Sequence, residues 1–527
     1  MAGQDDAFAL GAKAATTASA ALFGRLYTIL VAGIAFILVA RLLGPTSYGV
    51  YSVAMAVVGF FTAVGGSSIG ASFSKFIGEY SSVHNKRKIA ELLVNGYLIL
   101  VIVCVLLTML AFALSGFLAS YVLHNSAYTY VLEYASVIII ISVLFNDSYS
   151  ALAGFGLGRS MSLGVAIQIT VQSIISVALA FSGYGALAPI LGLILSYAVG
   201  TAFIVRTISK RVSFAGVRVS IKVMKHILGF ALPIAASNII TSISSNLTII
   251  VLGIFVTTAV VGDFGVVQRT NTLISTISDS IGVSLLPLFA AGLAQQRYNP
   301  RKSSAFYSYA VYVAFLFITP IMLYTVLLAT PFTVTVFNGV YAHASLYLAV
   351  MSVGVLVGIA GAYAPSLLMS ANKVMLVVKC YALIALVQLA FLAVLVPTFK
   401  GIGAVVQMFI VTPIATTLIF VYAARKALNA RLDLGKILRV VLAGLISAAF
   451  ILPLLYLVGT NYIVLLVVAV VEQALLYPPI LAITSAATRK DLRILKRVSG
   501  GTPVVGVIMG TLADYSLMFC PVSRTET

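Results

Sequence analysis

The stretch ARLLGPTSYGVYSVAMAVVGFF (residues 40–61) marks where one long apolar run of the chain ends and the next begins. Residues 16–40 form the first run and residues 50–74 form the second. A helix needs about 20 mostly apolar residues to cross the hydrocarbon core of a bilayer, and each run is long enough. Charged and turn-forming residues stand between them, among them Arg41 and Pro45. The stretch therefore predicts two transmembrane helices joined by a short loop.

The same criterion divides the rest of the chain into twelve further apolar segments. They cover residues 92–118, 130–153, 160–181, 186–205, 227–251, 260–290, 306–329, 345–370, 374–396, 402–424, 437–458 and 462–484. Pro287 predicts a kink or an end in the segment 260–290. The sequence thus predicts an all-α polytopic membrane protein with 14 transmembrane helices.

The composition excludes a water-soluble protein. Of the 527 residues, 61% are hydrophobic and 9% are charged, whereas soluble domains carry about a quarter charged residues. The net charge of +19 does not indicate a nucleic-acid partner, because the basic residues stand in short groups between apolar runs. The cysteines at 104, 380 and 520 lack metal-ligand spacing. We therefore expect no catalytic group, no metal and no cofactor.

The basic residues predict how the helices are oriented, since lysine and arginine are retained on the cytoplasmic side of a membrane. With a cytoplasmic N-terminus, 28 of the 32 lysines and arginines fall in the tails and the even-numbered loops. Arg41 and Lys400 fall in outer loops, and Arg25 and Arg269 fall inside predicted helices. This alternation predicts a multi-pass protein of the cell membrane with both termini cytoplasmic. The basic segment 488–498 predicts a helix lying on the anionic inner surface.

An internal repeat divides the predicted helices. YGVY (48–51) and SIGAS (68–72) in the second segment recur 213 and 212 residues later as VGDF (261–264) and SIGVS (280–284) in the eighth. We therefore expect two six-helix lobes related by a pseudo-two-fold axis, followed by an appended helix pair and a basic cytoplasmic or interfacial tail. Their predicted boundaries are 1–215, 216–430, 431–484 and 485–527. Such repeats enclose a substrate site between them.

The opening stretch also resembles the first outer loop of a known family. Its residues fit the pattern A-R-x-L-x-P-x-x-Y-G-x-Y at Ala40, Arg41, Leu43, Pro45, Tyr48, Gly49 and Tyr51, and FIGEY (76–80) before a basic loop fits as well. The pattern is similar to that of the polysaccharide-biosynthesis and oligosaccharide-lipid flippases of the multidrug/oligosaccharidyl-lipid/polysaccharide (MOP) superfamily. The resemblance implies a flippase, not an enzyme, that moves a polyprenyl-diphosphate-linked oligosaccharide from the cytoplasmic to the outer leaflet by alternating access. Its implied partners are this lipid-linked substrate, membrane lipids and enzymes of glycan assembly.

Polar residues inside predicted spans are the candidate substrate contacts, because a charge at mid-helix costs about 2.5–3.5 kcal/mol on insertion scales. Arg25 lies in the first segment, and Asn238 lies in the seventh. Arg269 lies in the eighth, with Gln268 and Asn271 beside it. A guanidinium donates two hydrogen bonds to a diphosphate at once and stays charged. Alternatively, Arg25 extends to the interface and the small polar residues hold helices together.

Acids inside the spans are candidates for binding Na⁺ or H⁺. Asp147 lies near the inner end of the fourth segment and Asp279 lies in the eighth, and Glu133 and Glu472 are candidates near segment ends. Asp279 could equally neutralise a neighbouring arginine. Two other functions stay open: a cation-coupled multidrug or metabolite exporter of the same superfamily, and a membrane-embedded glycosyltransferase or polymerase. The outer loops are short and nearly uncharged, which argues against the enzyme.

Overall fold

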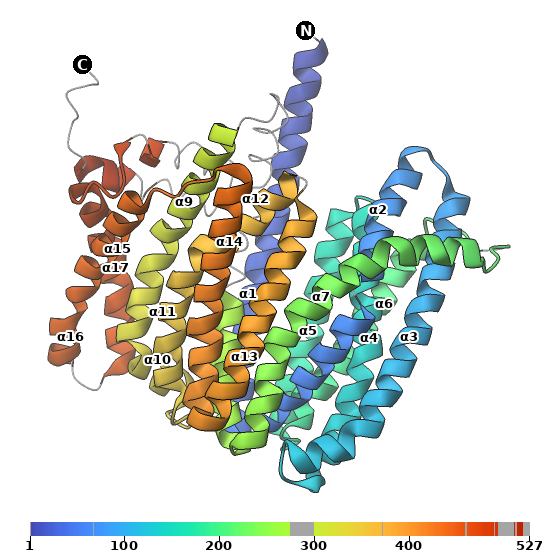
Figure 1. Ribbon diagram of the computed structural model, residues 1–527, viewed down its shortest axis with the longest axis horizontal. Coiled ribbons are helices and arrows are strands. Elements are labelled where there is room, and N and C mark those ends of the chain that lie inside the picture. The colour runs from blue at the N-terminus through green and yellow to red at the C-terminus, as the bar shows by residue number, and fades with distance from the viewer. Residues whose placement is uncertain are drawn as a thin grey trace. The chain divides into compact units, whose positions relative to one another are not determined.

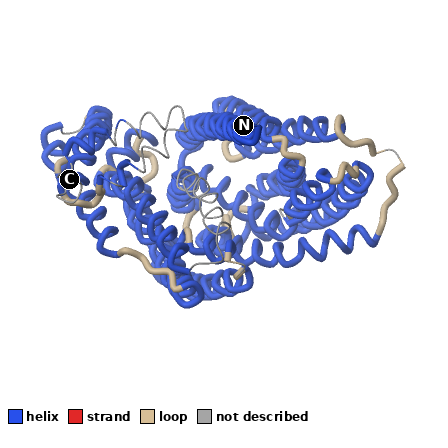
Figure 2. Tube along the Cα trace, turned by 90° about the horizontal axis from the view of Figure 1, so that it is seen from above, coloured by secondary structure: helices blue, strands red, loops and turns tan. Residues whose placement is uncertain are grey.

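The computed structural model describes residues 2–66, 68–214, 216–274, 300–371, 373–458, 461–489, 491–493, 511 and 514–519. Over these residues the chain is nearly all helix, and none of them lies in a strand (Figures 1 and 2). The contacts divide the chain into two compact units. The N-terminal unit comprises residues 20–266 and 392–404, and the C-terminal unit comprises residues 1–19, 267–391 and 405–527.

The N-terminal unit contains the helices from the first half of the chain. They are α1 (Ala2–Gly65, its first turns counted with the other unit), α2 (Ser68–Ser82), α3 (Lys86–Tyr121), the short η1 (Ser126–Tyr128), α4 (Thr129–Gly154), α5 (Gly158–Phe181), α6 (Leu187–Ser209) and α7 (Ile221–Phe255). A further helix over residues 258–274 begins in this unit.

The C-terminal unit contains most of the remaining helices. They are α9 (Pro300–Leu327), α10 (Ala329–Phe337), α11 (Ala344–Ala362), α12 (Ala364–Ser370), α13 (Val374–Val406, with residues 392–404 in the N-terminal unit), the π-helix η2 (Gln407–Val411), α14 (Thr412–Leu428), α15 (Leu434–Ala449), α16 (Ile451–Val458) and α17 (Tyr462–Ile483).

The predicted apolar segments coincide with these helices. All of them are helical over their described residues, apart from short breaks such as those at Gly66 and Tyr363. Eleven helices in the described part of the chain are long and apolar enough to cross a membrane. Two of them, Tyr27–Gly65 and Met375–Leu428, each cover parts of two predicted segments. The eighth segment is described only as far as Ile274, so Pro287 lies outside the described residues. The all-α polytopic membrane fold is confirmed; the count of 14 and the cytoplasmic termini stay predictions.

Two long helices change direction where outer loops were predicted. Gly44 in α1 has φ 67° and ψ 174°, and Lys400 in α13 has φ 53° and ψ −126°. Glycine adopts a positive φ without steric penalty, and the fixed φ of proline suits the first turn of a helix. The pair Gly44–Pro45 therefore ends one predicted span and begins the next within two residues.

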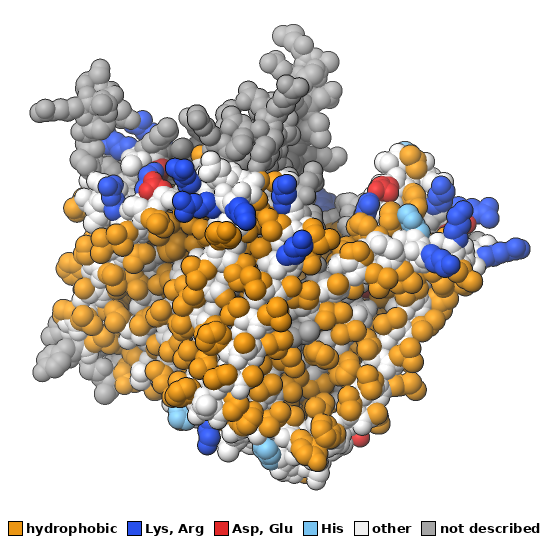
Figure 3. Space-filling view, viewed as in Figure 1, with side chains coloured by type: hydrophobic (Ala, Val, Ile, Leu, Met, Phe, Trp, Pro, Cys, Tyr) orange, Lys and Arg blue, Asp and Glu red, His pale blue; other side chains and the backbone are white. Residues whose placement is uncertain are grey.

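Each unit has its own apolar core and an apolar outer surface. Phe73 and Leu93 are fully buried in the core of the N-terminal unit, and Phe420 is fully buried in that of the C-terminal unit. Large apolar side chains also cover the outside, such as Leu106 (62% exposed) and Met109 (65% exposed) in α3. This pattern is expected where lipid is the solvent. Most of the lysines and arginines visible in Figure 3 lie at one end of the helices.

Helix α7 packs in the N-terminal unit. The ring centroids of Phe76 and His226 lie 4.5 Å apart, and the Ser72 hydroxyl donates to the Ile227 carbonyl at 3.5 Å. Compactness thus groups α7 with α2, whereas the sequence repeat assigns it to the second lobe. Packing and repeat symmetry are different properties, so the boundaries 1–215, 216–430, 431–484 and 485–527 stay a prediction.

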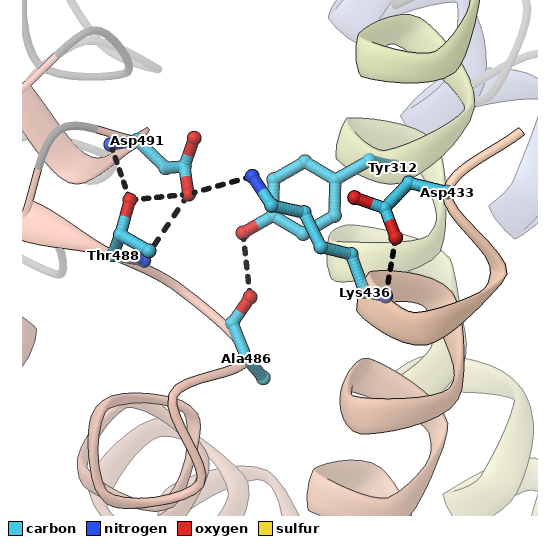
Figure 4. Close-up of polar contacts among 6 residues, drawn as sticks. All are labelled: Tyr312, Asp433, Lys436, Ala486, Thr488 and Asp491. Carbon is cyan, nitrogen blue, oxygen red and sulfur yellow. Dashed lines mark hydrogen bonds and ion pairs between the residues drawn. The ribbon is translucent and has the colours of Figure 1, made fainter.

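The start of the predicted tail docks on the C-terminal unit (Figure 4). The Tyr312 hydroxyl donates to the Ala486 carbonyl at 2.8 Å, and Lys436 Nζ lies 3.6 Å from Asp491 Oδ2 and 5.3 Å from the Tyr312 ring centroid. Thr488 N donates to Asp491 Oδ2 at 3.2 Å, and Asp491 N donates to Thr488 Oγ1 at 3.3 Å, which is the reciprocal pattern of a capping box. These contacts fix the first tail residues to α9 and α15.

Candidate functional site

The second half of α1 crosses the start of the helix 258–274 at two glycines. A Cβ atom on Gly49 would overlap the carbonyl group of Thr258, and a Cβ atom on Gly262 would overlap that of Pro45. The two contacts are equivalent under the repeat, because each residue of one lies 213 positions from its counterpart in the other. A two-fold axis produces such reciprocal pairs. The predicted outer ends of spans two and eight therefore meet at a pseudo-symmetric contact that requires glycine.

The helix 258–274 carries the predicted polar residues further along its length. Arg269 is exposed, and it follows Gly262 by seven residues, or about 10 Å along the helix axis. Gln268 and Asn271 are half-buried, and Gln268 Nε2 lies 3.9 Å from Met408 Sδ. The structure therefore brings Gln268, Arg269 and Asn271 together on one helix of the C-terminal unit. Asp279 lies outside the described residues.

Asn238 is half-buried in α7 of the N-terminal unit. The residues that follow it in α7 make a polar contact with α1. The Asn246 amide donates to Ser242 Oγ at 2.8 Å, and Ser242 Oγ donates to the Gly59 carbonyl at 3.2 Å. Sequence reasoning selected Asn238 but not Ser242 and Asn246. The signal available in the sequence was the four-residue step from Asn238 to Ser242 and again from Ser242 to Asn246, which places all three near one face of the helix. Ser242 and Asn246 hold α7 against α1, which is the structural role that small polar residues often have in membranes.

Asp147 is fully buried in α4 and contacts the start of α2. Its Oδ1 accepts a hydrogen bond from the Gly70 amide at 3.1 Å, and the neighbouring Ser148 hydroxyl lies 2.8 Å from the Tyr97 hydroxyl. Gly70 is the third residue of α2, so a carboxylate here binds one of the amides that the helix itself leaves without an acceptor. Asp147 therefore stabilises the break between α1 and α2.

Glu472 lies near the middle of α17 and is half-buried. Both of its carboxyl oxygens are shielded from solvent, and within the described residues neither has a hydrogen-bond partner. The nearby Tyr324 hydroxyl already donates to the Ser447 carbonyl at 3.2 Å. The sequence analysis placed Glu472, like Glu133, near a segment end, whereas the structure places Glu472 near the middle of α17 with both carboxyl oxygens shielded. Arg25 is helical in α1, but its side chain lies outside the described residues.

The chain has many membrane-spanning helices, and two of them cross at a pseudo-symmetric contact. One of these two helices also carries a polar stretch with an arginine. Together these features define a transporter built from an internal repeat. The family model of the polysaccharide biosynthesis proteins matches residues 16–293, more than half of the chain. The chain belongs to this family, within the MOP superfamily. A comparison with curated proteins by sequence gives no match.

Solved structures of transporters share the fold. The lipid II flippase MurJ in an inward closed conformation has a TM-score of 0.71 at 16% identity, over 88% of this chain and 98% of that one. A multidrug resistance MATE family transporter in an inward-facing conformation has a TM-score of 0.66 at 18% identity, over 77% and 98%. A MOP superfamily transporter from Pyrococcus furiosus has a TM-score of 0.58 at 18% identity, over 79% and 96%. These likenesses establish the fold, and the neighbours are transporters rather than enzymes.

Proposed function

We propose that the protein moves a polyprenyl-diphosphate-linked oligosaccharide from the cytoplasmic to the outer leaflet by alternating access. The observation that carries this proposal is the reciprocal contact of Gly49 and Gly262, because it joins the predicted outer ends of the two repeats without any covalent or ionic bond. Such a contact can close a passage on the outer side and part again. The family and the MurJ-like fold support a lipid-linked saccharide as the cargo.

The proposed contacts for the diphosphate lie on the polar stretch beyond this crossing. Among the described residues Arg269 is exposed, and a guanidinium can donate two parallel hydrogen bonds to phosphate oxygens. We assign Gln268, Asn271 and Asn238 to the sugars or the phosphate, since amides both donate and accept. Arg25, from the other repeat, is the proposed second cationic contact. The polyprenyl tail would stay in lipid throughout.

We also propose that Asp147 or Asp279 binds the cation that drives the cycle, and that enzymes of glycan assembly supply and receive the cargo. Asp147 fits this role only if its carboxylate serves the cation in addition to the Gly70 amide. A substitution that keeps the hydrogen bond and removes the charge separates the two roles.

The test of the flippase proposal is a transport assay on Arg269→Ala in proteoliposomes. Purified protein is reconstituted with a fluorescent lipid-linked oligosaccharide, and a glycosidase outside the vesicles measures how much substrate becomes accessible. Hydrogen bonds to a charged group contribute about 1.5–3 kcal/mol, so we expect the rate to fall about 10- to 100-fold. Arg269→Lys should recover only part of the rate, because lysine lacks the planar pair of donors.

Arg159→Ala is the matched control, because Arg159 is an exposed arginine in a predicted cytoplasmic loop. It should transport at the wild-type rate. A wild-type rate in Arg269→Ala would remove Arg269 from the substrate site. If the wild-type protein exports a cationic dye and does not move the lipid-linked sugar, its function is that of a multidrug exporter and not of a flippase.

A further inference from the structure

A groove lies between α13 and α14 of the C-terminal unit, near the ends that lead to predicted cytoplasmic loops. It has a volume of about 480 Å³. Lys379 and Lys426 line it together with Tyr422, and Cys380, Leu383 and Ile419 form part of its apolar wall. Its described lining includes these two lysines and no acidic residue.

The positions of the lysines give the groove a charged end and an apolar end. Lys379 lies five residues after the start of α13, and Lys426 lies two residues before the end of α14. The groove continues from there to Leu383 and Ile419, about 6 and 10 Å along the two helices. Lys426 Nζ lies 6.0 Å from the Tyr422 ring centroid, which holds its stem along the groove. The groove thus has an almost wholly apolar wall, with one lysine from each helix at the end nearer the predicted cytoplasmic loops.

This arrangement selects among anionic ligands. A phosphate ion would contact the lysines and leave most of the volume empty, since cavities of this size hold molecules with many more atoms. An amphiphile would fill both parts, because its headgroup neutralises the lysines and its chain covers the wall. Basic pockets between helices on the cytoplasmic side of membranes bind anionic lipid headgroups in this way.

We propose that this groove binds an anionic phospholipid of the inner leaflet, with its phosphate between Lys379 and Lys426 and an acyl chain along Leu383 and Ile419. The site belongs to one unit and does not depend on the proposed transport function. It would fix the position of α13 and α14 at the inner surface.

The test uses the absence of tryptophan from the sequence. Leu383→Trp places a single fluorophore in the groove wall, and Leu110→Trp places one on the apolar surface of α3; both leucines are 49% exposed. Each variant is reconstituted in phosphatidylcholine vesicles with a small fraction of brominated phosphatidylglycerol or, separately, of brominated phosphatidylcholine. Quenching by the bromines reports how often each lipid touches the tryptophan.

Each lysine near an anionic headgroup contributes about 1 kcal/mol, or about fivefold in affinity, so two lysines should make the Leu383→Trp variant prefer phosphatidylglycerol on the order of 30-fold. Leu110→Trp should show no such preference. Adding Lys379→Gln and Lys426→Gln to Leu383→Trp should abolish the preference. Adding Lys222→Gln and Lys225→Gln, which remove two charges at the start of α7, should leave it intact.

Any of the following results would overturn the proposal. Equal quenching by both lipids at Leu383→Trp would show that the groove does not select charge. A preference that survives loss of Lys379 and Lys426, or that is lost equally in the α7 control, would reflect general attraction to the surface. Displacement of the brominated phosphatidylglycerol by inorganic phosphate would mean an anion site without a lipid, and displacement by polyprenyl phosphate at equal amounts would assign the groove to the cargo lipid.

Discussion

At the scale of single residues, two substitutions of Asp147 separate its structural role from its proposed role in transport. Asp147→Asn keeps an oxygen that accepts from the Gly70 amide and removes the charge. Asp147→Ala also removes the acceptor, which costs about 1–3 kcal/mol for a buried group. We therefore expect Asp147→Ala to lower the unfolding temperature of the purified protein and Asp147→Asn to leave it near the wild-type value. If Asp147 binds the driving cation, Asp147→Asn should lose the dependence of transport on Na⁺ or pH.

The control for this experiment is Asp433→Asn, because Asp433 accepts from the Lys436 amide at 3.0 Å in the same manner but outside the predicted spans. It should change neither stability nor cation dependence. If cation-dependent transport persists in Asp147→Asn, Asp147 has only the structural role at α2. The coupling site would then be another acid, such as the half-buried Glu472, whose carboxyl oxygens are shielded in mid-helix.

At the scale of elements, the docked tail depends on one partly buried ion pair. The Lys436 side chain is 37% exposed and that of Asp491 is 10% exposed, at 3.6 Å. Lys436→Met keeps most of the side-chain volume and removes the charge, so the tail should detach more often. We expect cleavage by trypsin after Arg489 and Arg493 to accelerate about two- to fivefold, since such pairs contribute up to about 1 kcal/mol. Cleavage at the wild-type rate would show that the Thr488–Asp491 cap and the Tyr312 hydrogen bond hold the tail without it.

The elements themselves could be predicted because membrane helices are defined by length and hydropathy, which are local properties. The contacts between helices could not be predicted, because they depend on which helix packs against which. Gly59 and Gly262 read alike in the sequence, yet one faces the Asn246 side chain and the other faces a backbone carbonyl. For the same reason the sequence identified Asp147 as an acid within a predicted span but did not predict its hydrogen bond with the Gly70 amide. The polar residues of helix 258–274 could be selected because charge in an apolar segment is itself a local signal.

At the scale of the whole molecule, the repeat predicts that Gly49 and Gly262 act as one gate. A Gly→Ala substitution normally stabilises a helix by about 1 kcal/mol. Loss of the closed state in such a variant would therefore come from the glycine contact and not from helix propensity. A methyl group on either glycine overlaps a carbonyl, and the two overlaps are equivalent. Gly49→Ala and Gly262→Ala should therefore shift the protein toward the outward-open state by similar amounts.

This shift is measurable by labelling a cysteine beyond the gate. Thr272 is exposed on the helix 258–274, and the native cysteines are replaced by serine so that Thr272→Cys is the single thiol. A membrane-impermeant maleimide added from outside should label it slowly with both glycines present and several-fold faster in either alanine variant. Gly229→Ala is the control, because a Cβ on Gly229 in α7 meets no atom within 4 Å.

If both alanine variants label as slowly as this control, the outer contact does not gate the passage. If only one accelerates, the two repeats do not open symmetrically, and access would be controlled by one half of the molecule.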